Sequence, residues 1–313
     1  MYLGGLISLA FLAPSLIWQA RHGMPFLEIG SAGASGKNLT FSLLGFLGQQ
    51  VLLVGPGSAP IWLAGLWRFS FRPALPQLRV FPIAYAAMAM LFYLAHGKAY
   101  YLTPIYTVLL AGGAVAFEDW LRKPWPRWIL AGEVAIAGAV SAPLALPILP
   151  PENYTAYAHA LGMSPQTTAA ERNKNSPLPQ QLADMFGWRE MAEKVSAAYN
   201  ALPPEERANA VFFGRNYGEA AAIDVYGPAF NGPPAISGHN NYYLWGTRGF
   251  DGSVVLIVGG DPARYADAYL GVEPVGALDD PFALSFETRI PIYLLRGRRS
   301  PLAADWASLK HFE

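Results

Sequence analysis

The chain has 313 residues, of which 53% are hydrophobic and only 14% are charged. Because typical soluble proteins carry about 25% charged residues, these values exclude both a single large soluble domain and a disordered chain. The absence of cysteine excludes disulfides, thiol catalysis and thiolate metal sites, and neither half carries a basic patch of the size that nucleic acid requires.

The charges are distributed unevenly along the chain. Residues 1–149 hold nine basic and four acidic side chains, whereas residues 150–313 hold 13 basic and 18 acidic ones. This pattern predicts two domains, which are a transmembrane helical region over 1–149 and an acidic α/β domain over 150–313.

Five segments of the first half are long and apolar enough to span a membrane, for which about 20 residues suffice. The first of them has no basic start and no small-residue cleavage site, so we interpret it as a span rather than a signal peptide. It begins abruptly at Met1, and we therefore expect the chain to be a portion of a larger protein. Pro56, Gly57 and Pro60 interrupt the second segment. The five predicted spans are 2–20, 43–66, 80–96, 100–117 and 128–149.

Lysine and arginine concentrate in cytoplasmic loops. Loop 67–79 contains three arginines, and loop 118–127 contains two arginines and one lysine. The pattern predicts that both loops lie inside, whereas residues 21–42, the turn 96–99 and everything after residue 150 lie outside.

The second half alternates apolar runs with helical patterns, which predicts a small α/β domain. The run Val254–Val258 before Gly259-Gly260 indicates a buried central strand. We expect helices over 184–201, 217–226 and 262–270, and strands over 210–213, 254–258, 272–278 and 290–295.

The most informative stretch is the turn His96-Gly97-Lys98 and the two tyrosines after it. A charged group at membrane depth usually faces a cavity or a partner, and lysine binds phosphate as a point charge. Lys98 therefore indicates a lipid-phosphate site, with His96, Tyr100 and Tyr101 as its neighbours. The alternative from composition alone is a lysine that reaches to the membrane surface beside interfacial tyrosines.

Residues 92–106 and 109–114 resemble the Lys-x-Tyr-Tyr-Leu-x-Pro-x-Tyr…Ala-x-Gly-Ala stretch of glycosyltransferase family 39. This family contains the bacterial relatives of the dolichyl-phosphate-mannose protein mannosyltransferases. The resemblance covers roughly residues 1–150, and the tail resembles the C-terminal extracytoplasmic domain of bacterial members. The other segments that carry the resemblance are 14–19, 22–28, 49–50, 64–66, 183–188 and 237–246.

The resemblance implies part of a C-type glycosyltransferase fold in the bacterial inner membrane. It further implies transfer of a sugar from a polyprenyl-phosphate donor to an outer-face acceptor, which is a glycan, lipid or protein. The catalytic acidic residue of the family matches nothing in this chain, and Glu28 does not fit its motif. We expect His22 and Glu28 to line the same cavity as Lys98, although a lone histidine is more often ordinary surface. Gln49 and Gln50 are expected to hydrogen-bond between helices.

The segment 237–246 is the strongest binding candidate of the second half. Aromatic bodies with polar tips and amide side chains suit sugar recognition, which makes His239, Asn240, Tyr242 and Trp245 candidate sugar-binding residues. An ordered loop that packs its aromatic side chains on the core is an equal alternative.

Sequence motifs predict no cofactor and no metal. Val258-Gly259-Gly260-Asp261 lacks the dinucleotide fingerprint, and Gly214–Gly218 reads as a plain strand-to-helix turn rather than an anion site. The leading hypothesis is a membrane glycosyltransferase. The alternative is a non-enzymatic, membrane-anchored protein that binds a glycan or a partner, and a transporter is a third, weaker option because no pair of broken helices with matching halves occurs.

Overall fold

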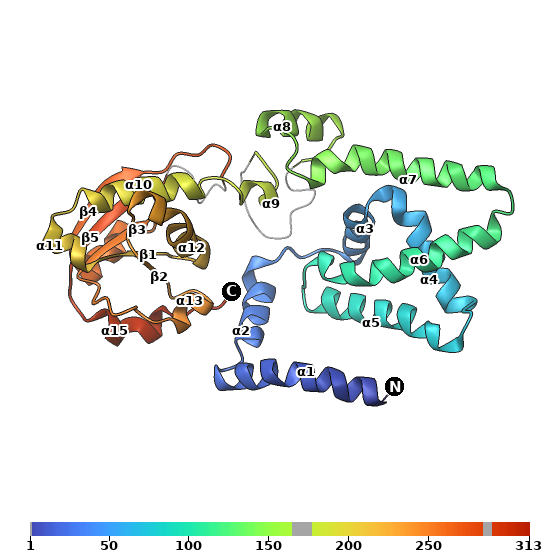
Figure 1. The fold of residues 1–313 in the computed structure, drawn as a ribbon, viewed down its shortest axis with the longest axis horizontal. Coiled ribbons are helices and arrows are strands. Elements are labelled where there is room, and N and C mark those ends of the chain that lie inside the picture. The colour runs from blue at the N-terminus through green and yellow to red at the C-terminus, as the bar shows by residue number, and fades with distance from the viewer. Residues whose placement is uncertain (1, 165–176, 284–289) are drawn as a thin grey trace. The chain divides into compact units, whose positions relative to one another are not determined.

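The computed structural model describes residues 2–164, 177–283 and 290–313. The chain divides into two compact units (Figure 1). The helical unit comprises residues 33–182, and the mixed unit comprises residues 1–32 together with 183–313. Residues 151–160, which follow the last apolar helix, therefore pack with the helical unit, and the domain boundary at 149/150 stays a prediction. Residues 165–176, which belong to the predicted second domain, lie outside the described range.

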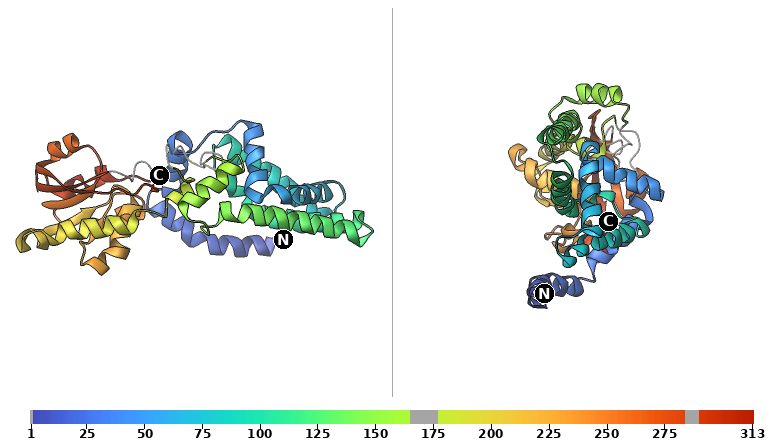
Figure 2. Two further views of the ribbon diagram at one scale, coloured as in Figure 1. Left: turned by 90° about the horizontal axis from the view of Figure 1, so that it is seen from above. Right: turned by 90° about the vertical axis from the view of Figure 1, so that its right-hand side faces the viewer.

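The helical unit is built from short and long helices joined by tight turns. A π-helical turn, η1 (Gly33–Lys37), opens it, and the 3-10 turns η2 (Pro56–Ser58), η3 (Pro76–Arg79) and η4 (Ala99–Leu102) precede three of its helices. The helix α7 is one long continuous rod (Figure 2). The helices are α3 (Leu43–Val54), α4 (Ala59–Phe71), α5 (Val80–Leu94), α6 (Thr103–Trp120), α7 (Pro124–Ala145) and α8 (Pro151–Ala160).

Within the described residues, four helical segments are long and apolar enough to cross a membrane. They correspond to four of the five predicted spans. The first segment lies within α1 (Tyr2–Arg21) of the mixed unit. The predicted span 43–66 is instead two helices, α3 and α4, because Gly55 adopts φ 94° and Pro56 follows it. The four segments are Leu3–Arg21, Pro76–Leu94, Ala99–Trp120 and Pro124–Ala145.

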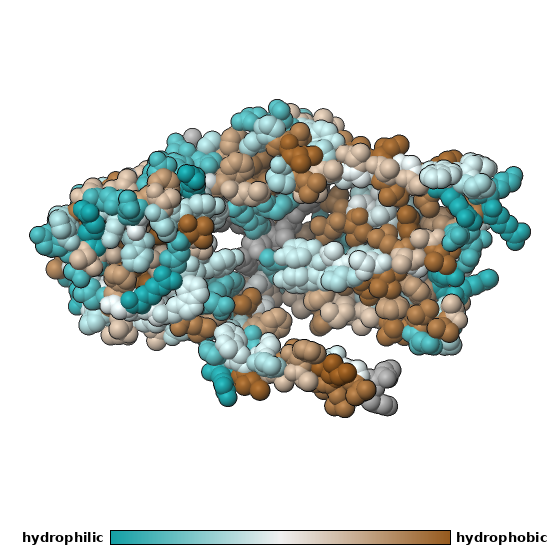
Figure 3. Space-filling view, in the orientation of Figure 1, coloured by the Kyte–Doolittle hydropathy of each residue, from teal (hydrophilic) through white to brown (hydrophobic). Residues whose placement is uncertain are grey.

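Large apolar side chains are exposed on the surface of these helices, which is unfavourable in water. Leu3, Phe11 and Ile83 are more than half exposed, and so is Trp128. Figure 3 shows this brown surface over α1 and over the helical unit, whereas the α/β part is mostly teal and pale. Exposed apolar area of this extent indicates contact with a lipid bilayer.

Helices α4 and α6 run in the same direction and touch through their backbones. Trp62 contacts Tyr106 near the start of both helices, with ring centroids 5.3 Å apart, and Trp67 contacts Trp120 near their ends. Between these contacts, a Cβ on Gly65 would lie 1.8 Å from the carbonyl oxygen of Leu109. Small residues permit such close approach between membrane helices.

The mixed unit contains a five-stranded sheet in the order β2-β1-β3-β5-β4. Strands β2, β1 and β3 are parallel, and β5 pairs antiparallel with both β3 and β4. This arrangement confirms the expected α/β character and the central position of β3. The strands are β1 (Ala210–Phe213), β2 (Ala235–Ile236), β3 (Val254–Val258), β4 (Tyr269–Ala277) and β5 (Pro291–Arg298).

Helices cover both faces of this sheet, because the buried strands are apolar on both sides. On one face, Met191 of α10 and Ile223 of α12 pack against Phe212. On the other face, Leu302 of α15 packs against Val255. The helices of the mixed unit are α1, α2 (Pro25–Ala32), α9 (Gln180–Ala183, at the boundary), α10 (Trp188–Asn200), α11 (Pro204–Asn209), α12 (Tyr217–Tyr226), α13 (Asn241–Leu244), α14 (Pro262–Ala268) and α15 (Leu302–Asp305), with the 3-10 turns η6 (Gly227–Phe230) and η7 (Trp306–Leu309).

The α4–α6 contact generates a prediction about stability. In Gly113→Ala, the added Cβ would lie 1.8 Å from the carbonyl oxygen of Ile61, so the helices must separate. We expect the free energy of unfolding to fall by about 1–3 kcal/mol. Thermal unfolding in detergent, followed by gel filtration, measures the change. Gly138→Ala in α7 is the matched control because nothing lies within 4 Å of its added Cβ, and equal unfolding temperatures for the two variants would contradict the contact.

Candidate functional site

The turn that carries Lys98 is shaped by the end of α5. His96 adopts the left-handed conformation, with φ 50°, and the backbone N–H of Gly97 donates to the carbonyl oxygen of Phe92 at 2.8 Å. This is the usual way in which a helix C-terminus closes, although a histidine rather than a glycine takes the left-handed position. The chain then extends at Lys98 (φ −69°, ψ 135°) and enters η4.

Two side-chain amides hold the backbone on either side of Lys98. The Nδ2 group of Asn38 donates to the carbonyl oxygen of His96 at 2.9 Å, and the Nε2 group of Gln50 donates to the carbonyl oxygen of Ala99 at 3.1 Å. Asn38 and Gln50 are both buried, with Gln50 only 1% exposed. The turn is therefore fixed by residues 58 and 49 positions earlier in the chain, and the predicted interhelical role of Gln50 is confirmed.

Gln50 belongs to a larger polar network inside the apolar helices. Its Oε1 atom accepts a hydrogen bond from the hydroxyl of Tyr106 at 2.9 Å, and the hydroxyls of Tyr106 and Tyr85 lie 3.1 Å apart. The ring of Trp62 packs against both tyrosines, and its buried Nε1 group has no hydrogen-bond partner in the described part of the chain. A buried amide or hydroxyl that loses its hydrogen bond is costly in such surroundings. The hydrogen bonds of Gln50, Tyr106 and Tyr85, together with the packing of Trp62, therefore specify one arrangement of α3, α4, α5 and α6.

Three of the four predicted phosphate-binding residues are more exposed than Lys98. Lys98 is half-buried, and its Nζ atom lies 5.9 Å from the centre of the Tyr100 ring. His96, Tyr100 and Tyr101 are exposed, and Tyr101 packs edge-on against both Tyr100 and Phe92. The four side chains thus share one turn, with the ring of Tyr100 near the ammonium group.

His22 and Glu28 belong to the mixed unit and have local partners there. The Nδ1 atom of His22 lies 2.7 Å from the carbonyl oxygen of Trp18, and its ring stacks on the indole of Trp18. The carboxylate of Glu28 accepts a hydrogen bond from the ammonium group of Lys310 at 2.8 Å. A common cavity for these two residues and Lys98 stays a prediction.

The four candidate sugar-binding residues make contacts in two separate clusters. His239 and Asn240 follow β2 and contact the end of the chain, where the rings of His239 and His311 stack at 4.5 Å. Tyr242 and Trp245 instead contact each other. They also contact Asp224 of α12 and Arg248 of the loop after α13. The four residues, which the sequence predicts to act together in one segment, therefore belong to two separate clusters.

The first cluster contains three residues, His239, His311 and Glu313, whose ligand atoms lie within 4.8 Å of one another. Its geometry does not suit a metal ion. The Nδ1 atom of His239 accepts a hydrogen bond from the backbone N–H of Tyr217, so its Nε2 atom carries the proton. The two imidazole rings are inclined by only 19° and stack face to face, whereas histidines that share one metal ion point their in-plane lone pairs at it.

The second cluster joins α12 to the loop after α13. The guanidinium group of Arg248 donates two hydrogen bonds to the carboxylate of Asp224, at 3.1 and 3.0 Å, and the hydroxyl of Tyr242 donates to the same carboxylate at 3.0 Å. Burial, together with this hydrogen bond, raises the pKa of Tyr242 to about 12, so the hydroxyl stays a donor at neutral pH. Arg248 also lies 5.3 Å from the centre of the Trp245 ring.

Glu219 occupies the start of α12, directly after β1. Its carboxylate accepts hydrogen bonds from the backbone N–H of Arg215 at 2.7 Å and from the side-chain amide of Asn216 at 3.1 Å. Asn216 in turn accepts from the backbone N–H of Glu219. This reciprocal capping was visible in the sequence as Asn-x-x-Glu before an apolar run, and it confirms the plain turn expected over 214–218.

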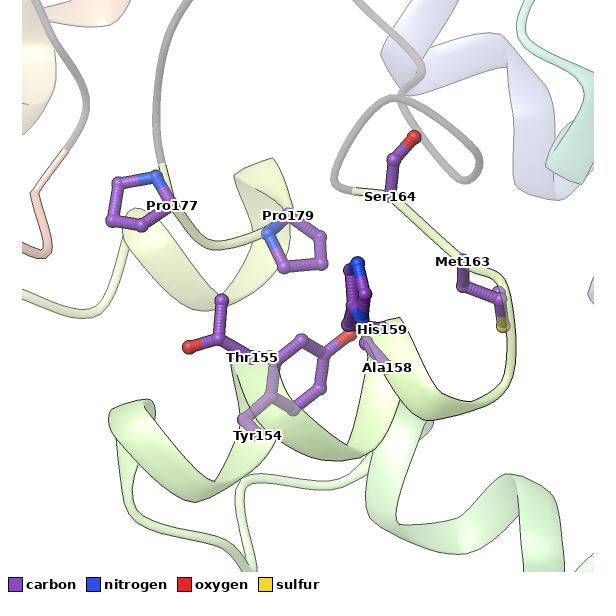
Figure 4. Close-up of a pocket in the computed structure, with 8 residues that line it drawn as sticks. All are labelled: Tyr154, Thr155, Ala158, His159, Met163, Ser164, Pro177 and Pro179. Atoms are coloured by element: carbon purple, nitrogen blue, oxygen red, sulfur yellow. The ribbon is translucent and has the colours of Figure 1, made fainter.

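A small cavity of about 140 Å³ lies beside α8 in the helical unit (Figure 4). Pockets for drug-sized ligands span roughly 300–1,000 Å³, so this cavity is too small for a sugar-lipid headgroup. It is lined by Tyr154, Thr155, Ala158, His159, Met163, Ser164, Pro177 and Pro179.

Comparison of the chain with protein-family models, with curated proteins and with solved structures finds no match. The sequence reasoning missed Asn38, Asp224 and Arg248, because each acts through a contact distant in sequence. The charge of Arg248 beside Trp245 was the available signal for the second cluster.

Glu219 generates a prediction about pH. Burial raises its pKa to about 7 from an ordinary value of 4.5, although its hydrogen bonds oppose the shift. The folded chain then binds this proton more tightly than the unfolded chain, so the contribution of Glu219 to stability falls by about 3 kcal/mol as pH rises through this window. Relative to wild type, Glu219→Gln is therefore expected to be more stable at pH 8 than at pH 5.

The measurement is the difference in thermal unfolding between the variant and wild type at the two pH values. The difference removes the opposite contributions of Asp251 and Asp305, whose pKa values are lowered. Glu193→Gln, on the exposed face of α10, is the matched control. A pH-independent difference for Glu219→Gln would show that this carboxyl group titrates normally.

Proposed function

We propose that this chain is part of a bacterial membrane glycosyltransferase, in which Lys98 binds the phosphate of a polyprenyl-phosphate sugar donor. The observation that supports this proposal is the pair of side-chain amide hydrogen bonds on either side of Lys98. Asn38 donates to the carbonyl oxygen of His96, and Gln50 donates to that of Ala99. A lysine that merely reaches to the membrane surface needs no such support. A turn whose backbone is already held requires less ordering when an anion binds to its lysine.

The proposed reaction is an inverting displacement at the anomeric carbon of the donor sugar. The acceptor hydroxyl oxygen forms a bond to this carbon, the carbon–oxygen bond to phosphate breaks, and the polyprenyl phosphate leaves with the electron pair. Lys98 stabilises the negative charge that develops on the leaving phosphate. A carboxylate accepts the hydroxyl proton, and its identity is unassigned because the acidic motif of the family matches nothing in this sequence.

Two contacts support the proposed outer location of Lys98 and of the C-terminal domain. Glu28 pairs with Lys310, and Asn38 bonds to His96, so the segment 21–42 contacts both the C-terminal domain and the turn of Lys98. The nine residues between Glu28 and Asn38 lie in the helical turns of α2 and η1, and at about 1.5 Å per residue they are too short to cross a bilayer. At the opposite ends of α4 and α6, Arg68 pairs with Asp119 near the basic loops predicted to lie inside.

This topology is open to labelling because the chain has no native cysteine. We expect a membrane-impermeant maleimide to label Ala95→Cys and Ser308→Cys in intact spheroplasts, because both positions are exposed and the proposed topology puts them outside. Ala74→Cys, which is equally exposed but lies in an inner loop, should react only after permeabilisation. Labelling of Ala74→Cys but not of Ser308→Cys in intact spheroplasts would place Lys98 on the wrong side for an outer-face donor.

Donor binding tests Lys98 directly. We expect Lys98→Ala to weaken the binding of undecaprenyl phosphate to the full chain in nanodiscs by at least about tenfold, because a charge-assisted contact to phosphate is lost. Gln50→Leu should weaken binding by a smaller factor, since the ammonium group remains but the turn is released. Binding of the labelled lipid is measured by titration.

Lys123→Ala is the matched control, because it removes one lysine from the loop predicted to lie inside. Equal affinity in Lys98→Ala and wild type would exclude Lys98 from the donor site and would favour the non-enzymatic alternative.

In cells, a deletion strain restored with Lys98→Ala is expected to lack the sugar modification that the wild-type gene restores, while membrane insertion of the variant is unchanged.

A further inference from the structure

We propose that Trp245, with Asp224 and Arg248 beside it, forms a binding site for a neutral sugar ring on the C-terminal domain. The site lies in the second of the two clusters described above and excludes His239 and Asn240, whose contacts are elsewhere. Trp245 is 55% exposed, so a large part of the indole is available to a ligand.

The indole is held in place by its own surroundings. Its ring packs against Tyr242 with centroids 4.4 Å apart, and its backbone N–H donates to the carbonyl oxygen of Tyr242 at 3.1 Å. The neighbouring Tyr243 accepts a hydrogen bond from the indole of Trp306 at 3.0 Å. An exposed aromatic side chain that packs against a neighbouring ring loses little conformational freedom when a ligand stacks on it.

Polar groups suited to hydroxyls lie next to this aromatic surface, with the guanidinium carbon of Arg248 over the Trp245 ring at 5.3 Å from its centre. Arg248 uses two of its five N–H groups on Asp224, and its other N–H groups make no hydrogen bond to the described residues. The carboxylate oxygens of Asp224 keep lone pairs beyond the bonds from Arg248 and Tyr242. The C–H-rich face of a pyranose packs on an indole while its hydroxyls need fixed donors and acceptors at the rim, which this cluster supplies.

The loop that presents these groups is conformationally restrained. Arg248 adopts φ 51°, a left-handed conformation that non-glycine residues rarely occupy, and it lies between Gly246 (φ 68°) and Gly249 (φ 86°). Such backbone conformations persist only where surrounding contacts enforce them. Here the paired hydrogen bonds to Asp224 enforce the conformation, so the loop displays Trp245 at a defined position.

The charge of the domain favours a neutral sugar over a membrane surface. Residues 150–313 carry 18 acidic and 13 basic side chains, so anionic lipid headgroups are repelled. Arg248 and Asp224 neutralise each other, so the cluster presents hydrogen-bonding groups with no net charge. This site does not depend on the proposed transfer reaction, because it holds no group assigned to the donor phosphate.

The test is the binding of the purified full chain, in nanodiscs, to immobilised oligosaccharides that end in glucose, mannose, galactose, N-acetylglucosamine or arabinose. We expect the affinity for the strongest binder to fall at least about tenfold in Trp245→Ala and to remain within a few-fold in Trp245→Phe, which keeps an aromatic face. Asp224→Asn should also weaken binding, because Arg248 loses its charged partner. Leu270→Ala is the matched control, since it removes an apolar side chain that is 73% exposed in the same domain.

The proposal is overturned if wild type binds none of these oligosaccharides, or if Trp245→Ala binds as well as wild type. Binding to phosphatidylglycerol vesicles that Trp245→Ala abolishes, with no sugar binding, would identify a membrane contact and also overturn it. Lys98→Ala should bind the oligosaccharides normally, so failure at this site is distinguishable from failure of the proposed donor site.

Discussion

A buried amide among apolar helices must find a hydrogen-bond partner, and two such amides determine the shape of the helical unit. The amide N–H groups of Asn38 and Gln50 meet this requirement by donating to the carbonyl oxygens on either side of Gly97 and Lys98. The loss of either bond leaves a buried polar group unpaired, so the turn and the helices are stabilised together. The ammonium group of Lys98 is consequently carried on a rigid backbone although its own side chain is only half-buried.

Helices α4 and α6 of this unit come close together because glycine, which has no side chain, lies at their contact. At Gly65 and Gly113 the backbones of α4 and α6 approach so closely that any Cβ would meet a carbonyl oxygen. The contact fixes the parallel course of these helices and places Arg68 beside Asp119. It also brings Trp62 against Tyr85 and Tyr106, which connects the helix contact to the hydrogen-bond network of Gln50.

In the mixed unit, the carboxyl edge of the parallel strands is occupied by side chains of the protein itself. Open α/β sheets usually bind ligands at this edge. Here Glu219 accepts the N–H of Arg215, and His239 accepts the N–H of Tyr217, so the donors that would hold an anion are already used. The exposed indole of Trp245 lies instead after α13, where it is flanked by Arg248.

The sequence by itself determined those helices and strands that are recognisable from the residues of one segment. Uncharged runs located four apolar helices, and the apolar residues of β3 identified the central strand, because hydropathy and periodicity act within one segment. Only the tertiary structure divided the segment 43–66 at Gly55 and separated His239 from Trp245 into two clusters. It also decided the partners of Lys98's turn and of Arg248, because these contacts join residues far apart in the chain and depend on how close the backbones approach.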